Sequence, residues 1–380
     1  MSFSISVPTQ DLRKAVAAVA LAVPNRANRP VLESALIRVT DGGEVIVTGT
    51  DLDLSISSRL PETVDATGSA AVAVPAKKLL AILRESTSES TLIREDAGGS
   101  VTIRSDRSRY KLSTWSVDEF PKLGTVAQTR TVEIPAAAAE AAIRRTVYAG
   151  DSQSQRYTLD GISLEIDRGA QALDFVATDG RRLSWMRVGY ESAALGEHET
   201  SPRVIIPLRA AKMLQTVLGS AQNARFVFGA SAVEVQTESC VVRTRLLEGR
   251  FPRWSELVPK DDGESPQVTA VIAAGTLSAA VRQAAITADF EEKALTLELK
   301  DGSLNISSSL TEIGESRVSV PVAFDGGEKS VRVNHRYVSD LCGSLSPEIE
   351  LKLSIASGKA PVLFHSDDGL LGIVMPMADA

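Results

Sequence analysis

The feature that most constrains the fold of this chain is a sequence pattern that occurs three times. A short apolar stretch leads into an Ala-rich helical pattern near residues 7, 134 and 272. A second marker, an apolar residue and a proline followed by a basic helical pattern, occurs at 74–80 and 206–214 and more faintly in the last third. The spacing of roughly 130 residues is the size of a whole domain and is too long for a solenoid repeat. The sequence therefore predicts three copies of one small domain.

The length of the chain agrees with this division. Its 380 residues suit two or three domains that each bury a core. We place the copies at residues 1–127, 128–260 and 261–380. The polar stretch at 261–266 is typical of a linker, and the boundary near 126–130 is less marked.

Each copy alternates between helical and strand patterns. Three of the six predicted helices follow Pro75, Pro135 and Pro207, and proline is common where a helix begins. The six helices are predicted at 9–22, 75–85, 135–148, 207–219, 274–288 and 333–345. β-branched alternation around glycine turns, as at 41–43 and 97–99, predicts antiparallel hairpins. The predicted fold class is α+β, with antiparallel sheets and two helices per copy.

Cysteine usage and hydropathy narrow the class of protein. Cys240 and Cys342 lie in different copies, so we expect free buried thiols in a reducing cytoplasm. Arg13-Lys14 and the apolar residues that follow resemble a secretory leader, but the same pattern recurs inside the chain and is better interpreted as the first helix of a copy. No apolar run approaches the roughly 18 residues of a membrane-spanning helix.

The distribution of charge predicts an anionic partner. The chain carries a net charge of −7, yet its predicted helices have a clear excess of Lys and Arg over Asp and Glu. Basic helix faces attract phosphate without selecting a base sequence. A simple preference of basic residues for solvated faces and helix ends is the alternative. On the first interpretation the helix residues that contact DNA are Lys77, Arg144, Arg145, Arg209 and Lys212.

No catalytic motif is recognisable. The sequence has no Walker A loop and no nucleophile elbow, and its three histidines lack metal-ligand spacing. A metal-dependent hydrolase that uses Asp51, Asp53 or Asp179 is one alternative, and a β-rich assembly protein unrelated to DNA is another. The aspartates fall at strand ends, where Asp side chains commonly form turns. The segment 178–181 of copy two corresponds to the segment of copy one that contains Asp51 and Asp53. A shared structural turn is therefore the favoured interpretation.

Four strings carry a resemblance to a known family. They are SRYKLST at 108–114, ATDGRRL at 177–183, GRFP at 249–252 and VMPM at 374–377. In this order they resemble the bacterial DNA polymerase III β subunits, the sliding clamps, along nearly the whole chain.

The resemblance implies a fold and a function. It implies three clamp domains per chain and a head-to-tail homodimer, a ring in which helices line a channel and sheets lie outside. Such a ring would encircle duplex DNA without sequence preference and tether the replicative polymerase by raising its effective concentration. It implies no turnover chemistry, no cofactor, and a place in the cytoplasm at the nucleoid.

The resemblance also implies site residues. DNA contacts are expected at Arg26, Gln153, Arg156 and Tyr157. At the dimer seam, Tyr110 and Leu112 of one chain are expected to meet Ile286 and Thr287 of the other.

A pocket is expected to accept short linear peptides from the DNA polymerase III α subunit, the clamp loader, repair polymerases and mismatch-repair proteins. Its residues are Leu159, Thr178, Gly180, Arg181, Arg182, Leu183, Pro252, Leu257, Ile373, Met375, Pro376 and Met377. Apolar side chains with methionine suit a groove that binds several partners. Taken singly, Leu159 and Leu183 are equally consistent with core packing. Arg181 stands where many members have histidine, and that change is expected to alter peptide preference.

Overall fold

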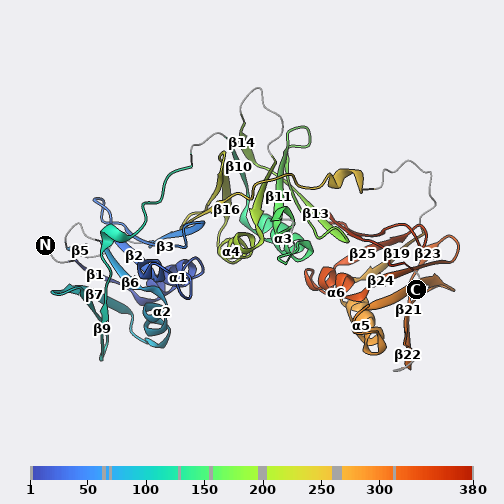
Figure 1. Ribbon diagram of the computed structural model, residues 1–380, viewed down its shortest axis with the longest axis horizontal. Coiled ribbons are helices and arrows are strands. Elements are labelled where there is room, and N and C mark those ends of the chain that lie inside the picture. Colours follow the sequence, from blue (N-terminus) through green and yellow to red (C-terminus); the bar gives the residue numbers. More distant parts are fainter. Residues whose placement is uncertain are drawn as a thin grey trace. The chain divides into compact units, whose positions relative to one another are not determined.

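The computed structural model describes residues 3–61, 66–67, 71–126, 130–153, 157–195, 203–258, 268–310 and 314–378. These residues form two compact units, and each unit holds two antiparallel sheets (Figure 1). The predicted copy boundaries, at 127/128 and 260/261, fall outside the described residues and stay predictions.

The first unit contains a five-stranded and a nine-stranded sheet. The five-stranded sheet has the order β5 (Ala66–Thr67), β1 (Ser4–Pro8), β7 (Ser90–Asp96), β8 (Ser100–Ser105), β9 (Ser108–Ser113). The nine-stranded sheet has the order β14 (Ser192–Ala194), β10 (Arg130–Pro135), β16 (Asn223–Phe228), β17 (Ala232–Gln236), β18 (Cys240–Arg245), β4 (Leu54–Arg59), β3 (Val45–Thr50), β2 (Ser34–Val39), β6 (Ala71–Pro75). Strands of the first and second predicted copies thus share one sheet, joined where Thr244 of β18 lies opposite Leu54 of β4.

The second unit contains a nine-stranded and a four-stranded sheet. The nine-stranded sheet has the order β15 (Arg203–Pro207), β11 (Gly161–Asp167), β12 (Ala172–Thr178), β13 (Arg182–Gly189), β27 (Leu370–Val374), β26 (Val362–Ser366), β25 (Glu350–Ile355), β19 (Val268–Ala273), β23 (Phe324–Asp325). The four-stranded sheet has the order β22 (Gly314–Pro321), β21 (Ser303–Leu310), β20 (Ala294–Lys300), β24 (Lys329–Asn334). Here β13 of the second copy pairs with β27 of the third, with Leu183 opposite Ile373.

All the predicted helices are present in the described residues. They are α1 (Thr9–Ala20), α2 (Ala76–Glu85), α3 (Ala136–Thr146), α4 (Leu208–Leu218), α5 (Ala274–Ala284) and α6 (His335–Gly343). α2, α3 and α4 begin directly after Pro75, Pro135 and Pro207, each of which ends a strand. The α+β class and the antiparallel sheets are confirmed. Among the described residues, none of the helices has the length and apolar character needed to cross a bilayer.

Four of the helices pack in two pairs. α1 lies beside α2 in the first unit, and α5 lies beside α6 in the second (Figure 1). The apolar face of α1 buries Leu12, Val16 and Val19 completely, and α1 contacts β3 and β4. Because this side-chain layer excludes water, each of these residues contributes roughly 1.5–3 kcal/mol to folding.

The two cysteines are buried within these cores. Cys240 and Cys342 are free thiols, as predicted, and burial raises the pKa of Cys342 to about 12. Cys342 therefore stays protonated and packs as a small apolar side chain.

The close approach of α1 to β3 depends on Gly49. A Cβ atom at this position would lie 2.6 Å from Val19 Cγ1 and 3.0 Å from the Val19 carbonyl oxygen. We predict that Gly49→Ala lowers the free energy of unfolding of the first unit by about 1–3 kcal/mol, because the helix must shift outward. Urea denaturation followed by circular dichroism would measure the effect. Gly42→Ala is the matched control, since the nearest atom to its new Cβ is 3.8 Å away; equal destabilisation by both variants would contradict the packing argument.

Candidate functional site

Part of the predicted peptide-pocket set meets at the join of β13 and β27. Arg182 lies opposite Val374 in this pairing, and Leu183 lies opposite Ile373. The chain after β27 continues along β13, since the amide N–H of Met375 donates to the carbonyl oxygen of Arg181 at 2.9 Å. Strand pairing therefore places Met375 beside the start of β13.

The site has an apolar floor and a partly exposed apolar surface. Leu183 and Ile373 belong to the floor, a buried cluster with Val176, Ile205, Phe251, Trp254, Leu363 and Leu371. Leu257 is 45% exposed and Met375 is 38% exposed. Leu159 and Thr178 are buried, so core packing accounts for Leu159 and Leu183. The exposed members of the predicted set are Gly180, Arg181, Leu257 and Met375, while Pro252, Pro376 and Met377 are half-buried.

Sequence reasoning missed the aromatic part of the floor. The indole N–H of Trp254, in the 3-10 turn η5 (Trp254–Glu256), donates to Glu165 Oε1 at 2.8 Å. Its ring lies 5.2 Å from that of Trp185, and this tilted aromatic pair stiffens the floor. The motif at 249–252 ends two residues before Trp254 and was the available signal.

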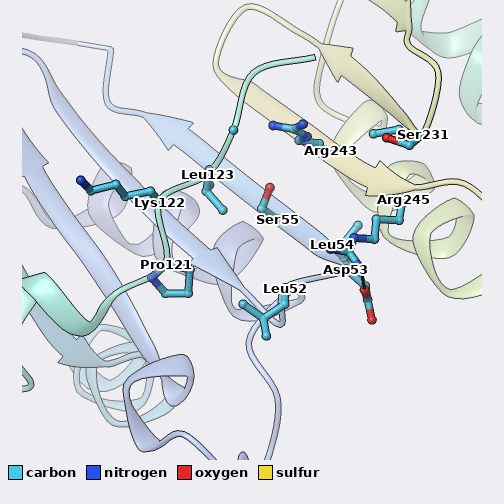
Figure 2. Close-up of a pocket in the computed structure, with 12 residues that line it drawn as sticks. Leu52, Asp53, Leu54, Ser55, Pro121, Lys122, Leu123, Ser231, Arg243 and Arg245 are labelled. Carbon is cyan, nitrogen blue, oxygen red and sulfur yellow. Dashed lines mark ion pairs between the residues drawn. The ribbon is translucent and has the colours of Figure 1, made fainter. Parts of the chain in front are cut away.

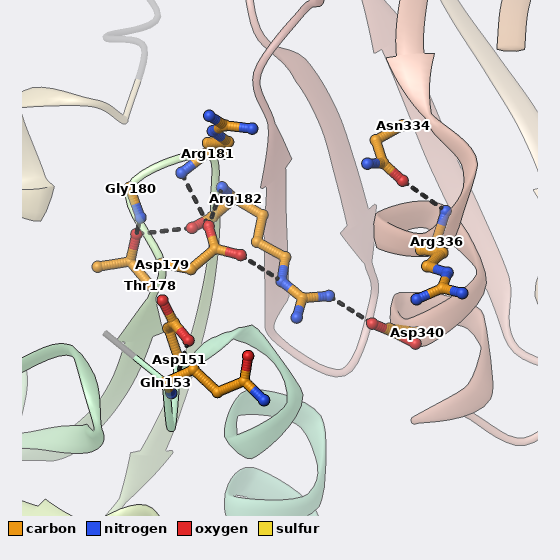
Figure 3. A network of polar contacts seen from close by, with 10 residues as sticks. All are labelled: Asp151, Gln153, Thr178, Asp179, Gly180, Arg181, Arg182, Asn334, Arg336 and Asp340. Carbon is orange, nitrogen blue, oxygen red and sulfur yellow. Dashed lines mark hydrogen bonds and ion pairs between the residues drawn. The ribbon is translucent and has the colours of Figure 1, made fainter. Parts of the chain in front are cut away.

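A tight turn begins the β13 side of the site (Figure 3). The carboxylate of Asp179 accepts the backbone N–H groups of Arg181 and Arg182 at 2.8 and 2.9 Å. The hydroxyl of Thr178 donates to the Arg182 carbonyl oxygen at 2.6 Å. Gly180 has a φ of +88°, a conformation that glycine adopts without strain.

The same turn occurs in the first unit, after β3. Thr50 donates to the Leu54 carbonyl oxygen at 2.8 Å, and Asp51 Oδ1 accepts the N–H groups of Asp53 and Leu54 at 3.1 and 2.8 Å. The structural turn predicted for both copies is confirmed. No group of three or more potential metal ligands occurs in the described ranges, and nothing supports the hydrolase alternative.

Arg182 ties β13 to helix α6 (Figure 3). Its Nε lies 3.0 Å from Asp179 Oδ2, and its Nη1 lies 2.6 Å from Asp340 Oδ2 on α6. The guanidinium also lies 4.7 Å from the ring centroid of Tyr337 and 5.5 Å from that of Tyr148. Burial raises the pKa of both phenols, so both rings stay neutral and can stack on the cation. Arg182 is thus a structural residue of the site, because only 12% of its side chain is exposed.

The basic residues predicted to contact DNA differ in exposure. Lys77, Arg209 and Lys212 are exposed on their helices, and Arg26 is exposed in the loop after α1. Gln153 is exposed, and its backbone N–H donates to Asp151 Oδ1 at 2.9 Å (Figure 3). Arg156 and the side chain of Tyr157 lie outside the described residues.

Two basic residues of α3 are engaged within the protein. Arg145 is 7% exposed, and its guanidinium lies 2.5 Å from Asp368 Oδ2. A DNA contact through Arg145 is therefore wrong, because the structure buries its charge against a carboxylate. Arg144 is half-buried and donates to the carbonyl oxygen of Ser344. Helical periodicity alone did not reveal which face of α3 packs inward.

The predicted seam residues lie on β9 in the first unit and in η6 in the second. Tyr110 is 38% exposed and Leu112 is half-buried, both on edge strand β9. Ile286 is 78% exposed in the 3-10 turn η6 (Ala285–Thr287), and the Thr287 hydroxyl lies 2.6 Å from that of Ser308. Phe290, which sequence reasoning missed, is 81% exposed. Ile286 and Phe290 are the two most exposed large apolar side chains among the described residues.

Comparisons with known proteins agree on one family. The models for the N-terminal, central and C-terminal domains of the DNA polymerase III beta subunit match residues 1–124, 133–253 and 256–378. The chain is 27% identical to the beta sliding clamp of Haemophilus influenzae, over 99% of this chain and 100% of the relative, and 26% identical to that of Pseudomonas aeruginosa, over 98% and 99%.

Solved structures show the same similarity. The sliding clamp of Pseudomonas aeruginosa bound to griselimycin superposes with a TM-score of 0.89 at 25% identity, and covers 100% of both chains. The clamp of Bacillus subtilis superposes with a TM-score of 0.89 at 23% identity over 100% of both chains, which shows the fold. The chain therefore has the three-domain DNA clamp fold.

We predict that Arg182→Met loosens the contact of α6 with β13. The change keeps most of the side-chain volume but removes the ion pairs with Asp179 and Asp340, and it leaves Asp179 largely buried without its cation. We expect a loss of about 2 kcal/mol in the free energy of unfolding, and faster hydrogen exchange in α6 measured by mass spectrometry. Arg253→Met is the control, because Arg253 and its partner Glu256 are 83% and 66% exposed, and such pairs contribute about 0–1 kcal/mol. An equal loss of unfolding free energy in both variants would contradict the role of Arg182 in holding α6 to β13.

Proposed function

The chain belongs to the family of DNA polymerase III beta subunits, the beta sliding clamps, and from this premise we propose that it closes into a ring around duplex DNA and tethers the replicative polymerase. It has no turnover chemistry of its own. We place it in the cytoplasm, at the nucleoid, since replication takes place there. The observation that carries the proposal is the repeated strand pairing between copies.

The chain makes the same kind of join twice. The strand that follows the Thr-Asp turn of one copy pairs with the last strand of the next copy, as β4 with β18 and β13 with β27. The corresponding strand of the third copy is β22, and the corresponding last strand of the first copy is β9. Both are edge strands within the described residues, with unpaired backbone groups on one side. Pairing β22 of one chain with β9 of a second chain repeats the join, and doing so twice gives a closed head-to-tail dimer.

The side chains at β9 support this closure. Tyr110 lies opposite Ile103 of β8, and Leu112 lies opposite Val101, both of which are completely buried. Because opposite residues of paired strands share a face, Tyr110 and Leu112 extend the buried layer of the sheet to its exposed edge. An apolar edge of this kind needs a partner, and Ile286 and Phe290 of a second chain have the required character.

The basic residues support contact with the DNA backbone. Arg26, Lys77, Arg209 and Lys212 have exposed cationic side chains, and Gln153 adds a polar one; Arg156 and Tyr157 complete the proposed set. Long, flexible cations in contact with phosphates attract DNA without fixing a register, so a ring that carries them can slide. The net charge of −7 over the whole chain limits tight binding elsewhere on its surface.

The surface at the join of β13 and β27 supports peptide binding. Leu257 and Met375 are exposed apolar residues above a rigid aromatic and aliphatic floor. Methionine and leucine adapt to different apolar partners, which suits short peptides from the DNA polymerase III α subunit, the clamp loader, repair polymerases and mismatch-repair proteins.

We predict that Ile286→Asp opens the dimer. The change would bury an unpaired carboxylate at the proposed seam, and we expect the dimer dissociation constant to rise by about two orders of magnitude or more. Sedimentation equilibrium would measure it. Val271→Asp is the control, because Val271 is an apolar residue that is also exposed (43%) but lies on β19, which pairs with β23 and β25 and is not part of the proposed seam. An unchanged dimer for Ile286→Asp would refute the placement of the seam.

The probe is a labelled peptide from the clamp-binding segment of the DNA polymerase III α subunit of the same organism. We predict that Met375→Asp weakens its binding by at least about tenfold, because a carboxylate loses hydration in an apolar site. Fluorescence anisotropy would measure the affinity. The site lies within one chain, so Ile286→Asp should retain peptide affinity while Met375→Asp retains the dimer. Loss of both properties in either variant would mean that the two sites are wrongly separated.

A further inference from the structure

A cavity of about 390 Å³ lies in the first unit, at the join of β4 and β18 (Figure 2). Its wall is formed by the turn after β3, the segment that leaves the first copy, and the facing ends of β17 and β18. The lining residues used below are Leu52, Asp53, Pro121, Lys122, Leu123, Arg243 and Arg245. The proposed function leaves this cavity unused, and its volume lies in the range of ligand sites.

Leu52 is held in a strained conformation at the edge of the cavity. Its φ is +87°, in the left-handed region that leucine rarely adopts, where the second unit has Gly180 at +88°. The Leu52 amide donates to the Thr50 hydroxyl at 3.0 Å, so the turn fixes this backbone geometry. Despite the strain, 48% of the Leu52 side chain is exposed, and it contributes little to the core. Strained residues of this kind are concentrated at ligand sites.

A second exposed leucine lies on the facing wall. Leu123 is 38% exposed, and Pro121 lies beside it (Figure 2). Phe120, directly before Pro121, is buried in a cluster with Val31 and Leu36 and anchors this wall. The cavity therefore has apolar side chains on two separate walls, which is the arrangement that holds an inserted apolar side chain.

The charged residues of the lining are mostly cationic. Arg245 is paired with Asp53 at 3.2 Å. Lys122 and Arg243 make no ion pair within the part of the chain that the structure describes, and both line the cavity (Figure 2). The lining thus has two cations beyond those that its single carboxylate neutralises, and it favours an occupant with carboxylates.

The cavity corresponds, copy for copy, to the candidate peptide site. Both lie at a join between the strand after a Thr-Asp turn and the last strand of the next copy. Both are flanked by a Phe-Pro pair with a buried phenylalanine, Phe120 here and Phe251 there. The differences are the leucine in place of glycine in the turn and the cations on the wall.

We propose that this cavity is a second peptide site, which takes a short extended segment of a partner protein with leucine-like side chains flanked by Asp or Glu. The apolar side chain inserts between Leu52 and Leu123, and the carboxylates pair with Lys122 and Arg243. The inference goes beyond the proposed function, because it concerns a join that the proposed peptide site does not use.

The test uses the full-length chain and a fluorescein-labelled peptide, Asp-Leu-Glu-Leu-Asp, with Lys-Leu-Lys-Leu-Lys as the charge-reversed probe. We expect saturable binding of the acidic peptide alone. Leu52→Gly removes the apolar contact and the backbone strain together, so it should be at least as stable to urea as the parent chain while its affinity falls about tenfold. Arg243→Glu should lower affinity at least as much, and Arg94→Glu, an exposed arginine on β7, is its control.

Met375→Asp separates the two sites. Binding that survives Met375→Asp and is lost on Leu52→Gly and Arg243→Glu establishes the second site, whatever becomes of the proposed function. Binding that is lost only on Met375→Asp assigns the peptide to the join of β13 and β27 and overturns the inference. Loss on Arg243→Glu with no effect of Leu52→Gly indicates a simple anion site and also overturns it, as does the absence of saturable binding up to millimolar peptide.

Discussion

Backbone pairing between strands of neighbouring copies is the interaction on which the rest of this structure depends. At β4 with β18 and at β13 with β27, an edge that would otherwise expose unpaired N–H and C=O groups is satisfied by the next copy. Each hydrogen bond contributes only about 1 kcal/mol net, but a set of them fixes register as well as stability. The same joins create the surfaces that we propose as partner sites, because each brings a turn of one copy against the last strand of another.

Each join is prepared by a turn of fixed chemistry. The Thr-Asp pair satisfies the backbone groups that would otherwise leave the strand end frayed, at Thr50–Asp51 and again at Thr178–Asp179. Arg182 then links its turn to α6, whereas the position of Arg182 in the first copy is Leu54, which is buried. The same turn is thus followed by an ion pair to α6 at Arg182 and by a buried apolar side chain at Leu54. What differs between the joins is the side chains around the turn, and those differences determine what each surface can bind.

Much of the fold was predictable because it rests on local pattern. The six helices, the glycine hairpins and the shared turn follow from periodicity and turn chemistry, which a single sequence displays. The sheets that run across copies were not predicted from pattern, because pairing between β4 and β18 joins residues far apart in the chain. The orientation of α3 was also missed. The sequence pattern predicts a surface position for Arg145, whereas in the structure its guanidinium pairs with Asp368. Phe290 and Trp254 were overlooked since a lone aromatic residue gives no periodic signal. Of the pocket residues inferred from resemblance, Leu183 and Ile373 pair at one join, but which members of the set are exposed could be decided only from packing.

The central claim is that a third join, between β22 of one chain and β9 of another, closes two chains into a ring. Small-angle X-ray scattering of the purified chain tests this most directly, because it reports mass and the distribution of internal distances together. The account predicts a particle with the mass of two chains and a distance distribution that requires a central void. A compact particle without a void, or a mass of one chain at the highest concentration measured, would contradict it.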